Sequence, residues 1–201
     1  MSSEESIFDM ESLKISKPKK HKNAEMMICK IRCNGDPVIL QFPKMKMVSS
    51  SKFIELEFTS KSGYSKKVFD ALINFDKFIV NLISIKSEEW FGKVIPEDKI
   101  NVMYNKFVKE NNGNTVINLT KSSTAEFIDN QENVISELVE GMTLESIGQL
   151  KHLIFTKDSC FVNWEIQTGK VHKKVLRVPK FGFINEDSSS DEESDEILTF
   201  F

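Results

Sequence analysis

The sequence has few of the residues from which metal sites, disulfide frameworks and many active sites are built. Its 201 residues include only three cysteines, three histidines and eight glycines. Cys29 and Cys33 have no second pair of ligands near them, so we expect buried free thiols and not a zinc site. The glycines form no phosphate-binding loop, and no Gly-x-Ser-x-Gly or comparable nucleophile motif occurs. These absences predict a protein without metal, cofactor or catalytic residues.

Long apolar runs and a secretion signal are absent as well. No run reaches the ~18 apolar residues that span a bilayer. The first residues, MSSEESIFDMES, are acidic and polar, unlike a signal peptide. An odd number of cysteines without regular spacing is typical of a reducing compartment. We therefore expect a protein of the cytosol or nucleus that does not contact membranes.

Charge is distributed unevenly along the chain. Residues 13–183 hold 27 basic and 19 acidic side chains, whereas residues 1–12 and 184–201 hold four and seven acids and no base. Such a basic body between acidic ends is typical of a polyanion-binding protein with an acidic interaction tail, although solubility alone gives the same pattern. Lysine outnumbers arginine by 25 to 2, which favours contact with phosphates over the reading of guanine edges.

Alternating apolar residues predict several strands. Two apolar runs flank Asn34 and Gly35, a pair that readily adopts the positive φ values of a tight turn, so residues 25–43 are predicted to form a β-hairpin. Residues 49–60 alternate as a half-buried strand. Further strands are predicted at 115–120, 125–130, 149–157, 160–167 and, as an edge strand, 173–179, while 132–148 fits either a short helix or a strand with a turn.

A helical insertion interrupts these strands. In residues 66–90 apolar side chains recur every three or four positions, which predicts an amphipathic helix of about four turns that ends before Gly92. Pro96 and the two acids after it predict the start of a second helix, with a buried stripe from Ile100 to Val108. The expected fold is mainly β, either a single-sheet α+β arrangement or a small barrel decorated by the two helices.

Composition divides the chain into three parts. Residues 1–25 have few apolar side chains and include the basic run KISKPKKHK, so we expect a disordered arm. Residues 26–183 are predicted to form the folded, nucleic-acid-binding domain. Residues 184–201 are predicted to form an acidic tail, which ends on two phenylalanines.

Lysines and aromatic residues are interleaved in two regions of the body. Cations that track phosphates and aromatic rings that stack on bases are the two ingredients of a groove for single-stranded nucleic acid. The same aromatics, on alternating strands, also fit a protein core. The candidate nucleic-acid-binding residues are Lys44, Lys46, Lys52, Tyr64, Lys66, Lys67, Phe161, Trp164, Lys170, Lys173, Lys174 and Arg177.

One stretch resembles a known family. The segment SEEWFGK at residues 87–93 lies between the two predicted helices, and an aromatic-x-x-Trp-x-hydrophobic element follows at Phe161, Trp164 and Ile166. Both features resemble a family of small proteins of nucleocytoplasmic large DNA viruses, which is similar in turn to the single-stranded DNA-binding proteins of podophages. The resemblance implies an oligonucleotide/oligosaccharide-binding (OB) barrel. Trp90 and Phe91 are expected to pack the helical pair onto that barrel.

The resemblance also suggests a function and a role for the tail. In the podophage proteins an acidic tail with a terminal aromatic residue recruits replication partners. The corresponding residues here are Asp191, Glu192, Glu193, Asp195, Glu196, Phe200 and Phe201. We expect a sequence-nonspecific, non-catalytic single-stranded DNA-binding protein of viral DNA replication or recombination. Its expected location is the host cytoplasm, in the viral factory, or the nucleus. A homodimer is compatible with the sequence.

Two other functions fit parts of the sequence. A virion structural or DNA-packaging protein would use the same basic body against encapsidated DNA and would be carried in the virion. A small viral hydrolase would need an acid–base or nucleophile set, which is not visible in the sequence.

Overall fold

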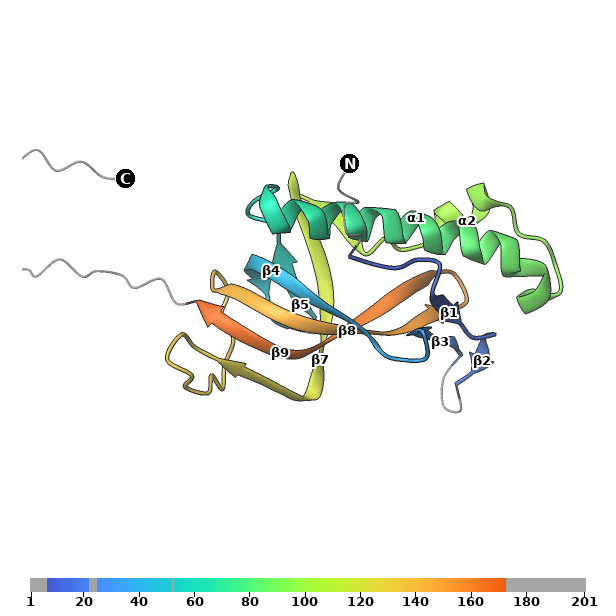
Figure 1. Cartoon of the computed structure of the whole chain (residues 1–201). Coiled ribbons are helices and arrows are strands. Elements are labelled where there is room, and N and C mark those ends of the chain that lie inside the picture. The colour runs from blue at the N-terminus through green and yellow to red at the C-terminus, as the bar shows by residue number, and fades with distance from the viewer. Residues whose placement is uncertain (1–6, 22–24, 52, 173–201) are drawn as a thin grey trace, which may run out of the picture.

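A computed structural model of the chain describes residues 7–21, 25–51 and 53–172. Figure 1 shows a strongly curled sheet with one long helix lying across it and a short helix beside the end of the long one. The elements are β1 (Leu13–Ile15), β2 (Lys19–Lys20), β3 (Met27–Cys33), β4 (Val38–Ser49), β5 (Ile54–Glu57), α1 (Gly63–Phe91), α2 (Glu97–Met103), β6 (Val108–Asn111), β7 (Asn114–Ile128), β8 (Thr143–Phe155) and β9 (Cys160–His172).

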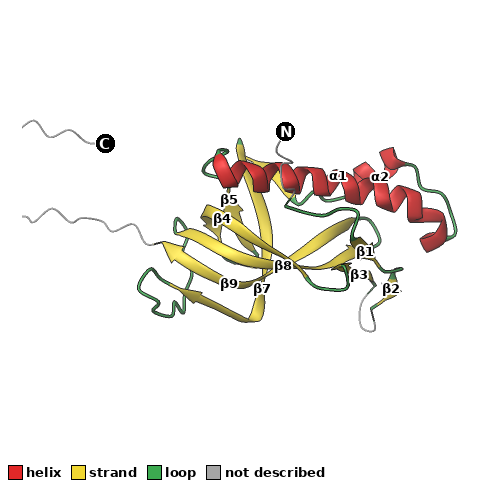
Figure 2. Ribbon diagram, viewed as in Figure 1, coloured by secondary structure: helices red, strands yellow, loops and turns green. Residues whose placement is uncertain are grey.

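Five strands form the barrel. β4 pairs antiparallel with β5 and β8, β5 pairs with β7, and β8 pairs with β9. The parallel pairing of β7 with β9 completes the circuit, although its register shifts between Lys121 and Glu126. A five-stranded, partly closed barrel with a helical insertion after its second strand is consistent with an OB-like fold, so the predicted fold class is confirmed (Figure 2).

The predicted hairpin is only partly correct. Asn34 and Gly35 have φ values of 51° and 95°, so the tight turn forms as expected. The two flanking strands are joined only by a bridge between Cys33 and Asp36. Both then pair with the same edge of β8, β3 along residues 152–155 and β4 along residues 143–150, while the other edge of β8 pairs with β9. Turn chemistry acts locally, whereas one edge of the long β8 supplies hydrogen-bond partners to both strands, and this tertiary pairing replaces the hairpin ladder.

The helix α1 is longer than the sequence predicts. It has 29 residues, and its buried positions continue at three- and four-residue steps from Val68 through Ile83 to Trp90. It ends where predicted, because Gly92 adopts φ 69° and donates its N–H to the carbonyl of Glu88 at 2.9 Å. Trp90 and Phe91 pack edge-on against Phe155 of β8, with ring centroids 6.2 and 5.2 Å away. The expected packing of the helical pair onto the sheet is confirmed.

The second helix is shorter than predicted, and the cause lies on α1. Asp76 is buried there, and its carboxylate accepts hydrogen bonds from the Tyr104 hydroxyl at 2.6 Å and from the backbone N–H groups of Phe107 and Val108 at 3.0 and 3.3 Å. These bonds take the chain out of the helix after Met103. The predicted helical stripe is therefore wrong beyond that point, and Val108 begins β6 instead.

A cluster of aromatic rings fills the space between the barrel and α1. Trp164 of β9 is at its centre, with ring centroids of Phe42, Phe107, Phe8 and Phe75 at 5.5, 5.9, 6.0 and 6.5 Å. Burial of such rings is a large part of the hydrophobic stabilisation of a small domain.

Part of the predicted disordered arm belongs to the fold. Phe8 is only 5% exposed, and β1 and β2 both pair antiparallel with β3. Residues 7–21 are thus ordered against the sheet. A few apolar side chains are enough to hold this polar segment in place, because β3 supplies hydrogen-bond partners for its backbone. The predicted strand at 173–179 and the tail lie outside the described residues. Within the described part of the chain, no helix is long and apolar enough to cross a membrane.

Candidate nucleic-acid interface

A groove of about 190 Å³ opens on the outer face of the barrel. We call it the barrel groove. It is lined by Phe53, Asn105, Lys106, Phe107, Lys109, Asn118, Thr120, Phe161, Val162 and Asn163. These residues come from the loop between β4 and β5, the connection from α2 to β6, and the strands β6, β7 and β9. Its lining combines lysines, amides and aromatic rings and contains no acid.

Strand alternation decides which side chains of β9 face this groove. Phe161 and Asn163 are half-buried and point outward, whereas Val162 and Trp164 are buried and point into the barrel. The structure therefore places Phe161 where a ligand can reach it. The prediction that Trp164 contacts nucleic acid is wrong. Its ring is 0% exposed and forms the centre of the core, so it is not presented to a base.

The Asp76 hydrogen bonds also position the loop that brings Lys106 to the groove. Tyr104, which bonds to Asp76, bridges to Cys160 at the start of β9, and the N–H of Asn105 donates to the Cys160 carbonyl at 2.8 Å. The loop is thereby held between α1 and β9. Because Phe161 follows Cys160 directly, a lysine and an aromatic ring are fixed on the rim of the same groove.

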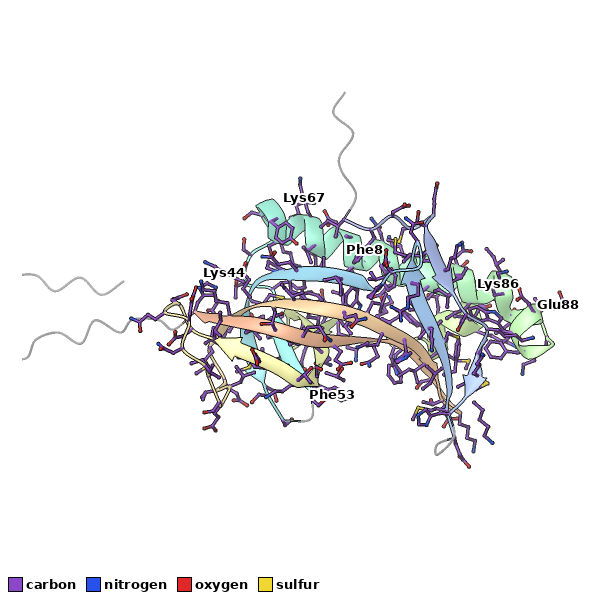
Figure 3. All side chains as sticks on the ribbon, turned by 60° about the horizontal axis from the view of Figure 1, so that its bottom comes forward. Phe8, Lys44, Phe53, Lys67, Lys86 and Glu88 are labelled. Carbon is purple, nitrogen blue, oxygen red and sulfur yellow. The ribbon has the colours of Figure 1, made fainter. Side chains whose placement is uncertain are left out.

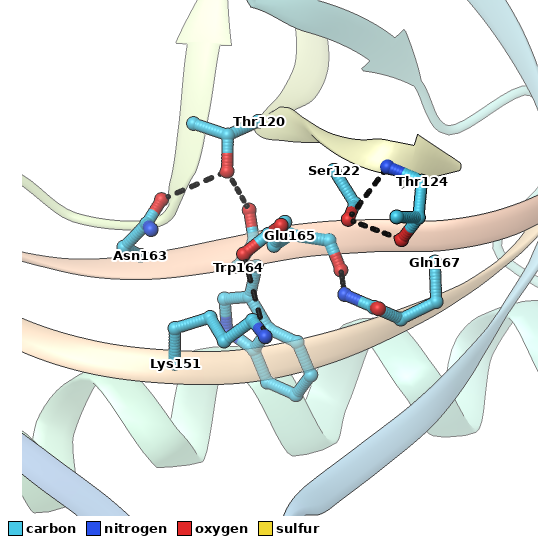
Figure 4. A network of polar contacts seen from close by, with 8 residues as sticks. All are labelled: Thr120, Ser122, Thr124, Lys151, Asn163, Trp164, Glu165 and Gln167. Carbon is cyan, nitrogen blue, oxygen red and sulfur yellow. Dashed lines mark hydrogen bonds and ion pairs between the residues drawn. The ribbon is translucent and has the colours of Figure 1, made fainter.

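A polar network orders the outer surface where β7 meets β9 (Figure 4). The Thr120 hydroxyl lies 3.0 Å from the carbonyl oxygen of Trp164 and 3.1 Å from Oδ1 of Asn163. Next to them, Lys151 Nζ lies 3.6 Å from the Glu165 carboxylate. The network fixes Asn163 on the groove wall, and the ion pair partly neutralises Lys151.

Phe53 joins the barrel groove to a second recess. That recess, of about 290 Å³, is lined by Ser50, Ser51, Phe53, Ile54, Lys121, Ser136, Glu137 and Leu138. Phe53 is 42% exposed, a large apolar surface for a residue between two polar hollows. Lys121 also lines this recess. Its Nζ lies 5.1 Å from the centroid of the Phe127 ring, and this contact orients the ammonium group.

The other predicted lysines form a separate cluster near the start of α1. Lys46 pairs with Glu57 at 3.7 Å, Lys66 pairs with Asp70, and the Tyr64 hydroxyl donates to the Gln41 carbonyl at 2.6 Å. Figure 3 shows Lys44 and Lys67 at this end of the molecule, whereas Phe53 lies on the side of the sheet away from the helix. The structure does not bring Lys44, Lys46, Tyr64, Lys66 and Lys67 to the barrel groove.

Lys170 does not line the barrel groove, but it lies close to Tyr64, because Gln41 of the Lys170 recess accepts the Tyr64 hydrogen bond. It lines a recess of about 390 Å³ near the end of β9, together with Gln41 and Glu145. The predicted residues Lys52, Lys173, Lys174 and Arg177, and all those of the acidic tail, lie outside the described residues. Their contribution to binding stays a prediction.

Sequence reasoning missed most of the groove lining. The sequence predicts Lys106 and Lys109 to lie in the second helix, whereas the chain there is a loop and an edge strand. Asn118 and Thr120 carried a usable signal, because they alternate with the buried Ile117 and Leu119 in β7. That alternation places them on the wet face of the sheet.

Cys29 is a buried free thiol, as predicted, whereas Cys33 is free but only half-buried. All three thiols are free, and burial raises the pKa of Cys29 to about 12 and that of Cys160 to about 11. These two thiols stay protonated at neutral pH and are poor nucleophiles or metal ligands. Among the residues that the structure describes, no three histidines, cysteines or acids gather where they could hold a metal ion.

No protein-family model and no curated protein matches the sequence. The fold, in contrast, is similar to that of gp2.5, a single-stranded DNA-binding protein encoded by bacteriophage T7, with a TM-score of 0.50 and 10% identity over 78% of this chain and 100% of the phage protein. The single-stranded DNA-binding protein of bacteriophage Enc34 gives a TM-score of 0.38 at 14% identity, over 80% of this chain and 90% of that one. The chain thus shares its overall fold with the T7 protein.

Proposed function

We propose that this protein binds single-stranded DNA without sequence specificity and without catalysis. The observation that carries the proposal is the barrel groove, which places Phe53, Phe161, Lys106 and Lys109 around one opening. OB-folds bind oligonucleotides on the face of their second and third strands and with the loop between the first two. Here these elements are β5, β7 and the β4–β5 loop that carries Phe53.

The groove supplies both parts of the required chemistry. Lys106, Lys109 and the neighbouring Lys121 are exposed, so their ammonium groups can follow a phosphate backbone. Phe53 and Phe161 offer faces on which bases stack, at about 1–3 kcal/mol per base and with little base preference. Lysines act as point charges and do not read base edges bidentately, which fits binding that ignores sequence.

We further infer a role in DNA replication or recombination of a large DNA virus. This inference rests on the SEEWFGK segment at residues 87–93 and on the fold shared with the T7 protein. In this role the acidic C-terminal residues would recruit replication proteins, and the protein would act in the cytoplasmic viral factory or the nucleus. A DNA-packaging role in the virion is the alternative, since it would need the same basic body.

Salt titration tests the binding proposal. Anisotropy of labelled (dT)16 is measured from low to physiological salt for the wild type and for the triple variant Lys106→Ala, Lys109→Ala and Lys121→Ala. Each lost lysine–phosphate contact should lower the log–log salt slope by about 0.7, so the triple variant should lose about 2.

The matched control removes three exposed lysines from the helical part of the chain, Lys77, Lys93 and Lys99. The control should retain the wild-type slope. Equal effects of the two triple variants would show general charge attraction and would refute the groove. Competition with duplex DNA of equal length separates the two functions, because a strand-binding protein prefers the single strand and a packaging protein does not.

A further inference from the structure

A second basic hollow lies on the same face of the sheet but outside the barrel. It measures about 370 Å³ and is lined by Ser16, Lys19, Lys20, His21, Ile28, Lys30 and His152. We call it the β3 recess. Three lysines and two histidines line it, and none of its described lining residues is an acid. The residues come from β2, β3, β8 and the segments beside β2, and Figure 1 shows β2 and β3 at the end of the sheet opposite the last residues of β9.

Strand register connects this recess to the barrel groove. Phe161 of β9 pairs with Ile154 of β8, Ile154 pairs with Ile28 of β3, and Ile28 pairs with Lys19 of β2. Side chains that face each other across neighbouring strands lie on the same side of the sheet and in contact range. One row of neighbouring side chains therefore runs from the aromatic rim of the groove to a lysine of the recess.

A second row runs beside the first. Asn163 pairs with His152, and His152 pairs with Lys30, whose backbone N–H donates to the Ser16 hydroxyl at 2.9 Å. The interleaved residues Val162, Leu153 and Cys29 are buried, which confirms that both rows face outward. Three strand spacings of about 4.8 Å give a path of about 14 Å, enough for at most about four nucleotides at the ~3.4 Å rise of a stacked strand.

The electrostatic surroundings of His152 support anion binding at this end of the path. Its pKa is lowered, first by burial and then by the positive charges of Lys151, Lys30 and Arg32, while Glu165 acts in the opposite direction. A ring that is already repelled by three cations lies in a positive field. A phosphate placed there would be attracted by the same field.

We propose that the β3 recess is a second phosphate-binding subsite, into which a single strand passes from the barrel groove over β9, β8 and β3. The inference rests on the proposed single-stranded DNA binding and adds a site outside the five barrel strands. Lys19, Lys20 and Lys30 hold the backbone of this part of the strand. Short oligonucleotides occupy the barrel groove alone, and longer ones occupy both sites.

The test compares a short and a long oligonucleotide. The double variant Lys19→Glu and Lys30→Glu is titrated with labelled (dT)4 and (dT)16, together with the control Lys77→Glu and Lys99→Glu, which makes the same charge change on the helices. At about 50 mM salt each lost contact is worth a factor of about 8, so the double variant should bind (dT)16 about 60-fold more weakly. Its affinity for (dT)4 should be unchanged, and the control should bind both oligonucleotides like the wild type.

Three results would overturn the subsite. The first is wild-type affinity of the variant for (dT)16, and the second is an equal loss for both lengths. The third is the same loss in the helix control. Wild-type protein that binds neither oligonucleotide would refute the proposed function itself, and the subsite with it.

A measurement on the wild-type protein avoids any effect of the substitutions on folding. The pKa of His152 is followed by proton NMR, with the resonance assigned by the variant His152→Gln. A phosphate in the recess should raise this pKa when (dT)16 is bound, whereas (dT)4 should leave it unchanged. An unchanged pKa with (dT)16 at saturation would refute the subsite.

Discussion

The buried carboxylate of Asp76 allows a sharp test of how α1 supports the barrel groove. We predict that Asp76→Ala strongly destabilises the protein and that Asp76→Asn is much milder. The carboxylate accepts the Tyr104 hydroxyl at 2.6 Å and the backbone N–H groups of Phe107 and Val108 at 3.0 and 3.3 Å. Alanine removes every acceptor. Asparagine can turn its oxygen toward the two backbone donors and its NH₂ group toward the Tyr104 oxygen, which then acts as the acceptor.

The magnitude follows from the number of donors left without a partner. An unsatisfied buried donor costs about 1–3 kcal/mol, and three of them outweigh the relief of no longer burying a charge. We expect Asp76→Ala to lower the free energy of unfolding by about 3–5 kcal/mol. Asp76→Asn keeps the hydrogen bonds and removes the buried charge, so its cost should be no more than about 1 kcal/mol.

Urea unfolding followed by tryptophan fluorescence measures both variants. Asp70→Asn is the matched control, because Asp70 lies on the same helix in an exposed ion pair with Lys66. Its loss should cost less than about 1 kcal/mol. Equal losses for Asp76→Ala and Asp76→Asn would refute the reasoning, since the cost would then come from the charge and not from the acceptors. A destabilisation by Asp76→Ala no larger than that of the control would refute it too.

Three further predictions concern other parts of the molecule. Phe53→Ala should weaken (dT)16 binding by about 5- to 150-fold, the cost of one lost stacking face, with unchanged unfolding in urea; unchanged affinity would remove Phe53 from the interface. Gly148→Ala should lower stability by about 1–3 kcal/mol in the same urea assay, because its Cβ would lie 2.6 Å from the buried Phe42 ring; an unchanged midpoint would contradict this. Burial raises the pKa of Asp76 above its ordinary value of 3.8. The hydrogen bonds from Tyr104 and the backbone lower this pKa, but their effect is smaller than that of burial. The native state therefore holds this proton after the unfolded state has lost it, so this contribution to stability is complete below pH 3.8 and is lost as pH rises through the folded pKa. Urea titrations at several pH values should show the stability difference between wild type and Asp76→Asn shrinking over that range, and a growing difference would contradict the direction of the shift.

Local signals in the sequence predicted local structure well. The turn at Asn34 and Gly35 and the end of α1 at Gly92 both form as expected, because positive φ is a property of the residue itself. Periodicity located α1, β5, β7, β8 and β9, with their lengths less accurately. The mainly β class with a helical insertion followed from the order of these patterns.

The candidate site was predicted less well, for two physical reasons. Alternation shows which residues of a strand share a face but does not say which face is exposed to solvent. The sequence therefore predicts both Phe161 and Trp164 as ligand contacts, although they point to opposite sides of the sheet. Lys106 and Lys109 lie where they do because Asp76, about thirty residues earlier in the chain, ends the second helix. A contact between residues so far apart in the chain does not show in the periodicity of apolar residues, so the sequence pattern cannot predict it.

The sequence by itself determined a basic body with acidic ends, the turns and helix ends, and the period of each strand, since these depend on residue type and near neighbours. Only the tertiary structure decided the partner of each strand. β3 and β4 pair with successive stretches of one edge of β8, and β9 closes the barrel between β8 and β7. The sequence does not specify these partners, because backbone donors and acceptors are alike in every strand. The choice among them is made by the packing of side chains such as Trp164, Phe75 and Phe8 that meet only in the folded core. The same pairing assembles the barrel groove and the β3 recess from residues that are scattered along the chain.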